Sequence, residues 1–304
     1  SVFKRAFFHP AAYAEHNSCG SHTADLEIRR TSLRSRPKKR PVDHRLSTVQ
    51  DTDFLMREEM RGHRIALEFE RAELAMQDHR IKSTVVVFGS SRVSEDQAAA
   101  ARSKQSSRSC RGWRSKISPS ACYQMARQFG RIVSERGSAL SSIEGGRENV
   151  ITTGGGPGIM EAANRGAADA GAPTIGLNIE LPTEQAPNRY ITPALSFHFH
   201  YFAVRKMHFA MRANALAAFP GGFGTLDEVF EILTLKQARR ASGMPIVLFC
   251  RDYWENVVDF YALAELSMIS QADLALFQIV ESAEEGWEAL LDRGLTISTP
   301  LKEK

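Results

Sequence analysis

The 304-residue sequence predicts an α/β fold, a doubly wound parallel sheet (Rossmann-like) with helices on both faces and a helical N-terminal extension. Short apolar runs alternate with amphipathic helical patterns from residue 82 to residue 296, as in parallel sheets with right-handed crossovers. Two of these runs are followed at once by a glycine-rich turn and a helix. Open parallel sheets bind ligands at such junctions, so the pattern also predicts where a site lies.

The individual elements follow in chain order from the same patterns. A helix of about 30 residues is expected from Asp51 to Arg80, because apolar residues line one side of it and charges the other. Strands are expected at Ser83–Phe88, Asn149–Thr153, Pro173–Ile179, Ser196–Phe202, Asn214–Phe219, Ile246–Cys250 and Leu276–Val280. Helices are expected at Ala121–Arg136, Ala162–Ala170, from Val204, from the turn at Pro220 to Arg239, and at Tyr253–Leu266 and Ala283–Arg293.

The chain is expected to hold one domain with extensions. The predicted parts are an irregular basic segment (1–47), an N-terminal helix (48–81), a nucleotide-binding catalytic domain (82–296) with a basic insertion (97–118), and a C-terminal tail (297–304). Positive charge gathers in residues 29–45 and 102–116. These runs are interpreted as solvated segments, the alternative being nucleic-acid or membrane contacts.

The composition narrows the classes of function. The sequence is 43% apolar and has no stretch of 18 consecutive apolar residues, so no transmembrane helix is expected. Residues 1–30 lack an apolar signal-peptide core, and the cysteines form no C-x-x-C pair, so a cytoplasmic protein without a disulfide framework is expected. His198, His200 and His208 have no acid or cysteine at useful spacing, so no metal site is expected and they are interpreted as polar-face or interface residues.

The stretch Pro220–Glu228, which reads PGGFGTLDE, is the most informative part of the sequence. Its three glycines let backbone N–H groups approach a ligand closely, and the start of the following helix adds partial positive charge. That arrangement suits a phosphate. A carboxylate, Glu228, follows in the first helical turn and indicates chemistry on the rest of the ligand. The alternative is a tight turn in which Thr225 caps the helix.

A second junction, Gly154–Glu161, reads GGGPGIME and follows the apolar run at 149–153. Pro157 suits the first turn of a helix. Neither junction is a G-x-G-x-x-G fingerprint with an acidic residue about twenty positions later, nor a G-x-x-x-x-G-K-[ST] loop. A conventional dinucleotide site and a P-loop NTPase are therefore both disfavoured.

Gly154–Glu161, the pair Arg205-Lys206 and Pro220–Glu228 together resemble the Lonely Guy (LOG) family, whose pattern is P-G-G-x-G-T-x-x-E preceded by an Arg-Lys pair. The resemblance covers residues 82–293, and the form of the first motif is similar to the longer, bacterial-type subgroup. Family members are cytokinin riboside 5′-monophosphate phosphoribohydrolases, long mislabelled lysine decarboxylases. A decarboxylase is disfavoured, because no lysine context for pyridoxal phosphate is visible.

The resemblance implies roles for individual residues. Glu228 would stabilise positive charge at C1′ and activate water, and Arg205 would act as the second catalytic residue by orienting ribose, water or carboxylate. Which group protonates the leaving base stays open. For Lys206 the alternative is a solvated helix residue, and for Thr234 it is a bond to its own helix backbone. The substrate-binding residues implied are Ser90, Arg92, Gly155, Gly156, Gly158, Met160, Glu161, Glu184, Lys206, Gly221, Gly222, Phe223, Gly224, Thr225, Leu226, Asp227 and Thr234.

The resemblance implies an enzyme that cleaves the N-glycosidic bond of an AMP-like nucleoside 5′-monophosphate, without a cofactor. The base preference stays open between N6-modified adenine, as in cytokinin activation, and plain AMP or other nucleotides. A non-catalytic nucleotide sensor or carrier on the same fold is the alternative from another class. The resemblance also implies a homo-oligomer, at least a dimer, with the Arg205 helix near the interface, and neither a membrane nor nucleic acid is expected as a partner.

Overall fold

The computed structural model describes residues 47–95, 118–140, 145–180, 186–241 and 243–297. The basic runs at 29–45 and 102–116, the insertion at 97–118 apart from Ser118, and Glu184 lie outside the described residues. The chain divides into two compact units, residues 1–61 and residues 62–304. Among the described helices, none is both long enough and apolar enough to cross a bilayer.

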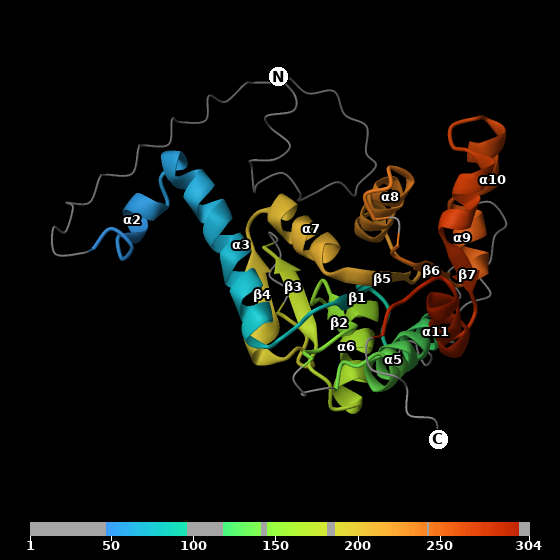
Figure 1. The fold of residues 1–304 in the computed structure, drawn as a ribbon, viewed down its shortest axis with the longest axis horizontal. Coiled ribbons are helices and arrows are strands. Elements are labelled where there is room, and N and C mark those ends of the chain that lie inside the picture. The colour runs from blue at the N-terminus through green and yellow to red at the C-terminus, as the bar shows by residue number, and fades with distance from the viewer. Residues whose placement is uncertain (1–46, 96–117, 141–144, 181–185, 242, 298–304) are drawn as a thin grey trace, which may run out of the picture. The chain divides into compact units, whose positions relative to one another are not determined.

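The larger unit is built on a seven-stranded, all-parallel sheet (Figure 1). Its strand order is β4-β3-β2-β1-β5-β6-β7, so the chain winds outward from β1 in one direction and from β5 in the other. This confirms the predicted doubly wound fold. The strands are β1 (Thr84–Phe88), β2 (Val150–Thr153), β3 (Ile175–Ile179), β4 (Ser196–Phe199), β5 (Ala213–Ala218), β6 (Ile246–Phe249) and β7 (Gln278–Val280).

Helices cover both faces of the sheet, and a separate hydrophobic core lies beneath each layer (Figure 1). One core receives side chains from α5 (Pro119–Arg136), α6 (Ile159–Asp169) and α11 (Ala283–Asp292). The other core receives them from α3 (Arg61–Asp78, from Gly62 onward in this unit), α7 (Phe202–Met211), α8 (Phe223–Gln237), α9 (Arg251–Val257) and α10 (Phe260–Glu265).

The central strands are apolar throughout because both of their faces are buried. Along β1, Val85 and Val87 enter the core beneath α5 and α6, whereas Val86 and Phe88 enter the core on the opposite face. This period of two is the strand geometry that the apolar run predicted.

The single helix expected from Asp51 to Arg80 is wrong. The smaller unit contains the short helix α2 (Thr52–Leu55) and the 3₁₀ turn η1 (Glu58–Met60) before α3 begins. Arg57 has extended backbone between them, with φ −63° and ψ 151°. Helix α2 buries none of its residues, so no packing favours a continuous helix through this charged stretch.

The helix expected from Tyr253 to Leu266 is also two helices, α9 and α10. Val258 is extended, and the Asp259 side chain accepts a hydrogen bond from the Ala262 N–H at 2.9 Å, which starts α10. An N-cap aspartate thus interrupts the apolar periodicity. The strand expected to run to Phe202 is shorter. Strand β4 ends at Phe199, because Tyr201 serves as the N-cap of α7.

His208 corrects another expectation. Its side chain is only 3% exposed and stacks on Phe69 with ring centroids 4.9 Å apart, so it is a core residue and not a polar-face residue.

Candidate functional site

The candidate site lies where the strand order reverses, at the carboxyl ends of β1 and β5. The turns that follow these strands touch, since the Ser90 N–H donates to the Pro220 carbonyl at 2.9 Å. Ligands of open α/β sheets bind at this position. A cleft of about 870 Å³ opens here between the two turns. It is lined by Phe88, Gly89, Ser90, Ser91, Arg92, Val93, Met160, Phe202, Arg205, Pro220, Gly221, Gly222, Phe223, Gly224, Thr225, Leu226, Asp227, Glu228, Tyr253 and Val257.

The turn after β5 presents bare backbone to this cleft. A Cβ placed on Gly222 or Gly224 would meet open space, and the side chain of Phe223 is 92% exposed. Gly222 is the N-cap of α8, so the unpaired N–H groups and the positive dipole end of that helix lie at the cleft. We call Gly221–Gly224 the open turn. It offers the features that bind an anion such as phosphate.

Thr225 does not cap α8 but lies within its first turn and is buried. Its side chain packs against Gly221, where an added Cβ would come within 2.1 Å of the threonine Oγ1. Thr225 therefore requires a glycine at position 221, and the pair shapes the base of the open turn.

Glu228 lies in the second turn of α8, one turn later than the sequence predicted, and is almost fully buried, with 6% of its surface exposed. Burial raises the pKa of this carboxyl to about 7, against the opposing charges of Lys206 and Arg205. A carboxyl group that titrates near neutral pH in a cleft can act as a base or stabilise developing positive charge.

Arg205 projects from α7 and is confined on three sides. Its Nε donates to the Leu177 carbonyl at 2.9 Å, and its guanidinium lies 5.1 Å from the centre of the Phe209 ring. A Cβ on Gly154 would come within 2.7 Å of Arg205 Nη2, so the first glycine of the earlier junction makes room for this side chain. Burial lowers the pKa of Arg205, with Glu228 and Asp227 opposing, but an arginine still stays charged.

Lys206 faces α8. Its Nζ forms ion pairs with Asp227 Oδ2 at 2.8 Å and with Glu231 Oε2 at 2.6 Å. Lys206 thus joins α7 to α8 on either side of Glu228 and supplies charge that lowers the pKa of Glu228. These ion pairs differ from the solvated alternative, and the substrate contact of Lys206 stays a prediction.

Ser90 and Arg92 both line the cleft, as expected of a turn that contacts a ligand. The Ser90 hydroxyl accepts from the Arg92 N–H at 3.1 Å, and the Ser90 carbonyl accepts from the Ile159 N–H at 3.0 Å. This turn therefore links the open turn to the start of α6.

The turn at Gly154–Gly158, which we call the closed turn, packs against protein. A Cβ on Gly155 would lie 2.3 Å from Asn178 Oδ1, and one on Gly158 would lie 2.3 Å from the Ser90 carbonyl oxygen. The Asn188 amide donates to the carbonyls of Gly155 and Gly156. Of the predicted residues in this junction, Met160 lines the cleft, whereas Gly155, Gly156 and Gly158 are buried beside it.

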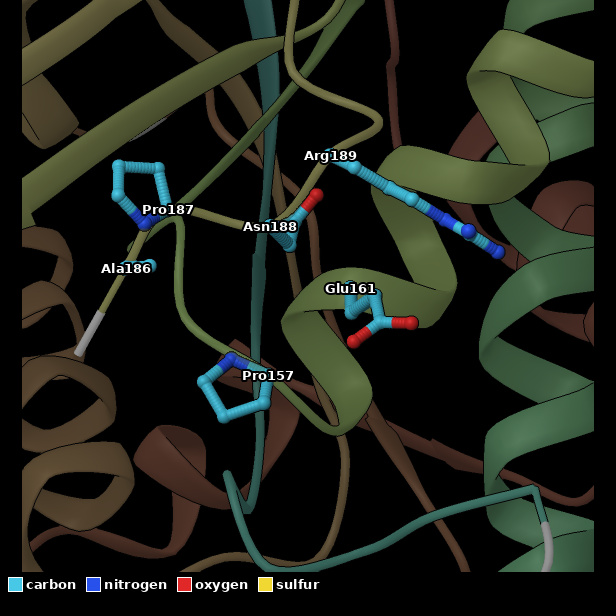
Figure 2. A pocket seen from close by; sticks show the side chains of 6 residues that line it. All are labelled: Pro157, Glu161, Ala186, Pro187, Asn188 and Arg189. Atoms are coloured by element: carbon cyan, nitrogen blue, oxygen red, sulfur yellow. The ribbon is translucent and has the colours of Figure 1, made fainter.

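Glu161 lies at a second cavity, of about 490 Å³, formed by α6 and the segment before β4 (Figure 2). Figure 2 shows it on the first turn of α6, with Arg189 extending across the same helix. The Tyr123 hydroxyl donates to Glu161 Oε1 at 3.3 Å. The remaining lining residues are Pro157, Ala186, Pro187 and Asn188.

Thr234 lies along α8 on a groove of about 590 Å³ that also includes Phe223, Leu226, Asp227 and Phe230. Its hydroxyl donates to the Phe230 carbonyl at 2.7 Å, the backbone bond given above as the alternative. The groove reaches the cleft through Phe223, Leu226 and Asp227.

Sequence reasoning assigned no role in the site to several cleft residues, among them Phe202, Tyr253 and Val257. The Tyr253 hydroxyl donates to the Gly221 carbonyl at 2.5 Å and supports the open turn from α9. No local motif marks this tyrosine. It reaches the site because β6, which precedes α9, pairs with β5.

The sequence is similar to those of known proteins. The family model described as "possible lysine decarboxylase" matches residues 160–290. A probable cytokinin riboside 5′-monophosphate phosphoribohydrolase of Oryza sativa subsp. japonica is 30% identical over 147 residues, which are 46% of this chain and 53% of the rice protein. The chain therefore spans about half the length of this relative.

Two solved structures are also similar. The molybdenum cofactor binding protein of Rippkaea orientalis is 20% identical, with a TM-score of 0.43, over 69% of this chain and 96% of its own. A structural-genomics target is 18% identical, with a TM-score of 0.43, over 69% of this chain and 99% of its own.

Proposed function

Because the chain belongs to the Lonely Guy (LOG) family, we propose that it hydrolyses the N-glycosidic bond of an adenosine 5′-monophosphate, including N6-modified forms. The reaction consumes one water and releases the free base and ribose 5-phosphate. The observation that carries this proposal is Glu228, a buried carboxyl with a pKa of about 7, one helical turn beyond an open, glycine-lined helix N-terminus. An anion site alone would not need a buried carboxylate beside it.

The substrate is proposed to bind with its 5′-phosphate at the open turn. The N–H groups at the start of α8 and the helix dipole would hold the phosphate, and Ser90 and Arg92 would contact phosphate or ribose from the facing turn. With the phosphate anchored there, the ribose would extend toward Glu228. Met160 and Phe202, which also line the cleft, would border the ribose or base.

Cleavage develops positive charge at C1′ of the ribose. The Glu228 carboxylate would stabilise that charge and accept a proton from the attacking water. Arg205 is a poor proton donor, and its confinement against Leu177, Phe209 and Gly154 suits an orienting role toward the ribose, the water or Glu228. Residues 82–296 would make up the catalytic domain.

The test is to incubate the protein with AMP and, separately, with isopentenyladenosine monophosphate, and to quantify free base and ribose 5-phosphate. Glu228→Gln should lower kcat by about 10²- to 10⁴-fold, the usual contribution of a general acid or base. Glu288→Gln, at an exposed position on α11, is the control and should leave kcat unchanged. The ratio of the two wild-type rates would decide between cytokinin activation and general nucleotide cleavage.

If wild type releases base from neither nucleotide yet binds AMP, the hydrolase proposal is wrong and a nucleotide sensor or carrier takes its place. Equal activity of Glu228→Gln and wild type would remove Glu228 from the chemistry.

We also propose that the chain forms a homodimer through α7 and α8. Large apolar side chains are exposed on both helices: Phe202 (49%), Met207 (49%), Met211 (51%) and Phe223 (92%). Phe202 and Phe223 also line the cleft, so a second copy covering them would enclose the site. Phe223→Ser should shift the mass measured by light scattering toward the monomer, and an unchanged dimer would place the interface elsewhere.

A further inference from the structure

We propose that α3 is a positioning element for Arg205, because it holds the helix that carries Arg205 at both ends. The catalytic side of this inference rests on the proposed function. The structural side rests on contacts between α3 and the segment 200–212 within the larger unit, and these can be tested without any activity.

The first contact is at the N-terminus of α7. This helix has no side-chain cap of its own. Instead, the Glu68 carboxylate of α3 accepts hydrogen bonds from the His200 N–H at 2.9 Å and the Tyr201 N–H at 3.2 Å. A carboxylate at this end also interacts favourably with the helix dipole. Arg64, one turn earlier on α3, donates from Nε to the Tyr201 hydroxyl at 3.3 Å.

The second contact is at the C-terminus of α7. Arg212, the C-cap residue, directs both terminal nitrogens at the two carboxylate oxygens of Glu73 on α3. The side chains of Arg212 and Glu73 are only 14% and 15% exposed. The hydrogen bond from Arg212 holds the pKa of Glu73 down at about 2, so this ion pair persists across the physiological pH range.

The third contact lies between the two ends. Phe69 of α3 stacks on His208 of α7, with 28° between the ring planes. The same histidine lies against Phe199 of β4. Helix α7 is therefore held against both rotation and sliding by groups spaced along a single helix, α3.

Arg205 is sensitive to such movement because its guanidinium has little room. Its contacts with Leu177, Phe209 and Gly154 come from β3, α7 itself and the closed turn. A small tilt of α7 would break the bond to Leu177 or press the guanidinium on Gly154. A displacement of about 1 Å can cost about 100-fold in rate when the displaced group is catalytic.

The sharpest variant is Glu68→Gln. Glutamine has one acceptor oxygen, which can keep one of the two hydrogen bonds from His200 and Tyr201. Its NH₂ group cannot accept the other, and the negative charge is lost. Glu68 belongs to neither hydrophobic core, so the variant should fold. Glu70→Gln, at an exposed carboxylate on the same helix, is the matched control. Glu68→Gln should lower kcat for base release by about tenfold, and Glu70→Gln should leave it unchanged.

A double-mutant cycle separates positioning from a general effect. If Glu68 acts through Arg205, Glu68→Gln should cost less than about twofold once Arg205→Lys has already removed the correctly placed guanidinium. The proposal is wrong if Glu68→Gln lowers kcat by the same factor with and without Arg205→Lys. It is also wrong if Glu68→Gln alone does not lower kcat.

Hydrogen–deuterium exchange tests whether α3 holds α7 without any measurement of activity. In Glu68→Gln, amides of residues 202–211 should exchange at least about tenfold faster than in wild type or Glu70→Gln, because local opening becomes easier. Unchanged exchange would show that α3 does not hold α7. If wild type releases no base from any nucleotide, the proposed function fails. The exchange result alone then decides whether α3 holds α7 in place.

Discussion

The closed turn and the open turn look alike in sequence but differ in what their backbone meets. Both follow a buried strand and start a helix at the same edge of the sheet. In the closed turn, Gly155 lies against Asn178 and Gly158 against the backbone of Ser90 and Ser91. In the open turn, Gly222 and Gly224 meet open space. Glycine in such a turn indicates a close backbone approach without telling whether protein or ligand makes it.

The two turns depend on each other. The Ser90 carbonyl accepts a hydrogen bond from the Ile159 N–H at the start of α6. The Ser90 N–H donates to the Pro220 carbonyl just before the open turn. The closed turn thus uses its helix N-terminus to fix the β1 turn, which in turn supports the open turn. One glycine junction would then be the support and the other the binding surface.

Substituting one glycine in each turn tests this difference most directly. Gly158→Ala must adopt φ +77° with its Cβ 2.3 Å from a carbonyl oxygen, so the free energy of unfolding should fall by about 4 kcal/mol. Gly222→Ala keeps φ −97° and meets open space, so the same quantity should change by less than about 0.5 kcal/mol. Urea titrations of both variants provide the measurement.

The effects of the two variants on KM for the nucleotide should have the reverse order. Gly222→Ala places a methyl group where the phosphate is proposed to lie and should raise KM for the nucleotide by about tenfold, or about 1.4 kcal/mol. Gly158→Ala should alter KM little in the fraction that stays folded. If both variants lose stability equally and KM changes in neither, the distinction between the two turns is wrong.

The pH dependence of base release sharpens the comparison, because the titrating carboxyl lies beside the open turn. Burial raises the pKa of Glu228 to about 7, and the proposed role needs the ionised form. Below pH 7, kcat/KM should therefore fall about tenfold per pH unit, and it should level off above that pH.

Lys206→Met provides the matched test of that assignment. Lys206 lowers the pKa of Glu228, so removing its charge should move the midpoint of the profile to higher pH. Lys82→Met, at an exposed position, should leave the midpoint in place. A midpoint that stays fixed in Lys206→Met would mean that another group controls the profile.

Most of the fold could be predicted because parallel strands buried on both faces leave unbroken apolar runs, as in Val85–Val87. The errors lie where one local interaction overrides periodicity. Asp259 caps α10 in the middle of an apolar pattern, and extended backbone at Arg57 separates α2 from η1. Such interruptions depend on single residues, which a periodicity analysis averages away.

The site could be predicted only where its residues are close in sequence. Glu228 and the open turn belong to one motif. Arg205 and Lys206 form the Arg-Lys pair that precedes this motif in the family pattern. The pairing of Lys206 with Asp227 and Glu231 depends on how α7 packs against α8, and the contact of Tyr253 depends on strand order. Such information is tertiary, so no spacing in the sequence reveals it.

Tyr253→Phe makes the smallest expected change and isolates the support of the open turn. Only the hydroxyl that donates to the Gly221 carbonyl is lost, while the ring continues to line the cleft. The free energy of unfolding should fall by about 1 kcal/mol, the usual net contribution of one hydrogen bond. Without that bond, the open turn should hold the phosphate less well, so KM for the nucleotide should rise about threefold to fivefold with kcat nearly unchanged.

Tyr261→Phe is the control for this variant, because Tyr261 lies on α10 with 67% of its surface exposed. It should alter neither stability nor KM. A fall in kcat alone for Tyr253→Phe would instead assign the tyrosine hydroxyl to the chemical step. Since the hydroxyl bonds to the carbonyl of the first glycine in the open turn, an effect confined to KM is what a role in shaping the phosphate site requires.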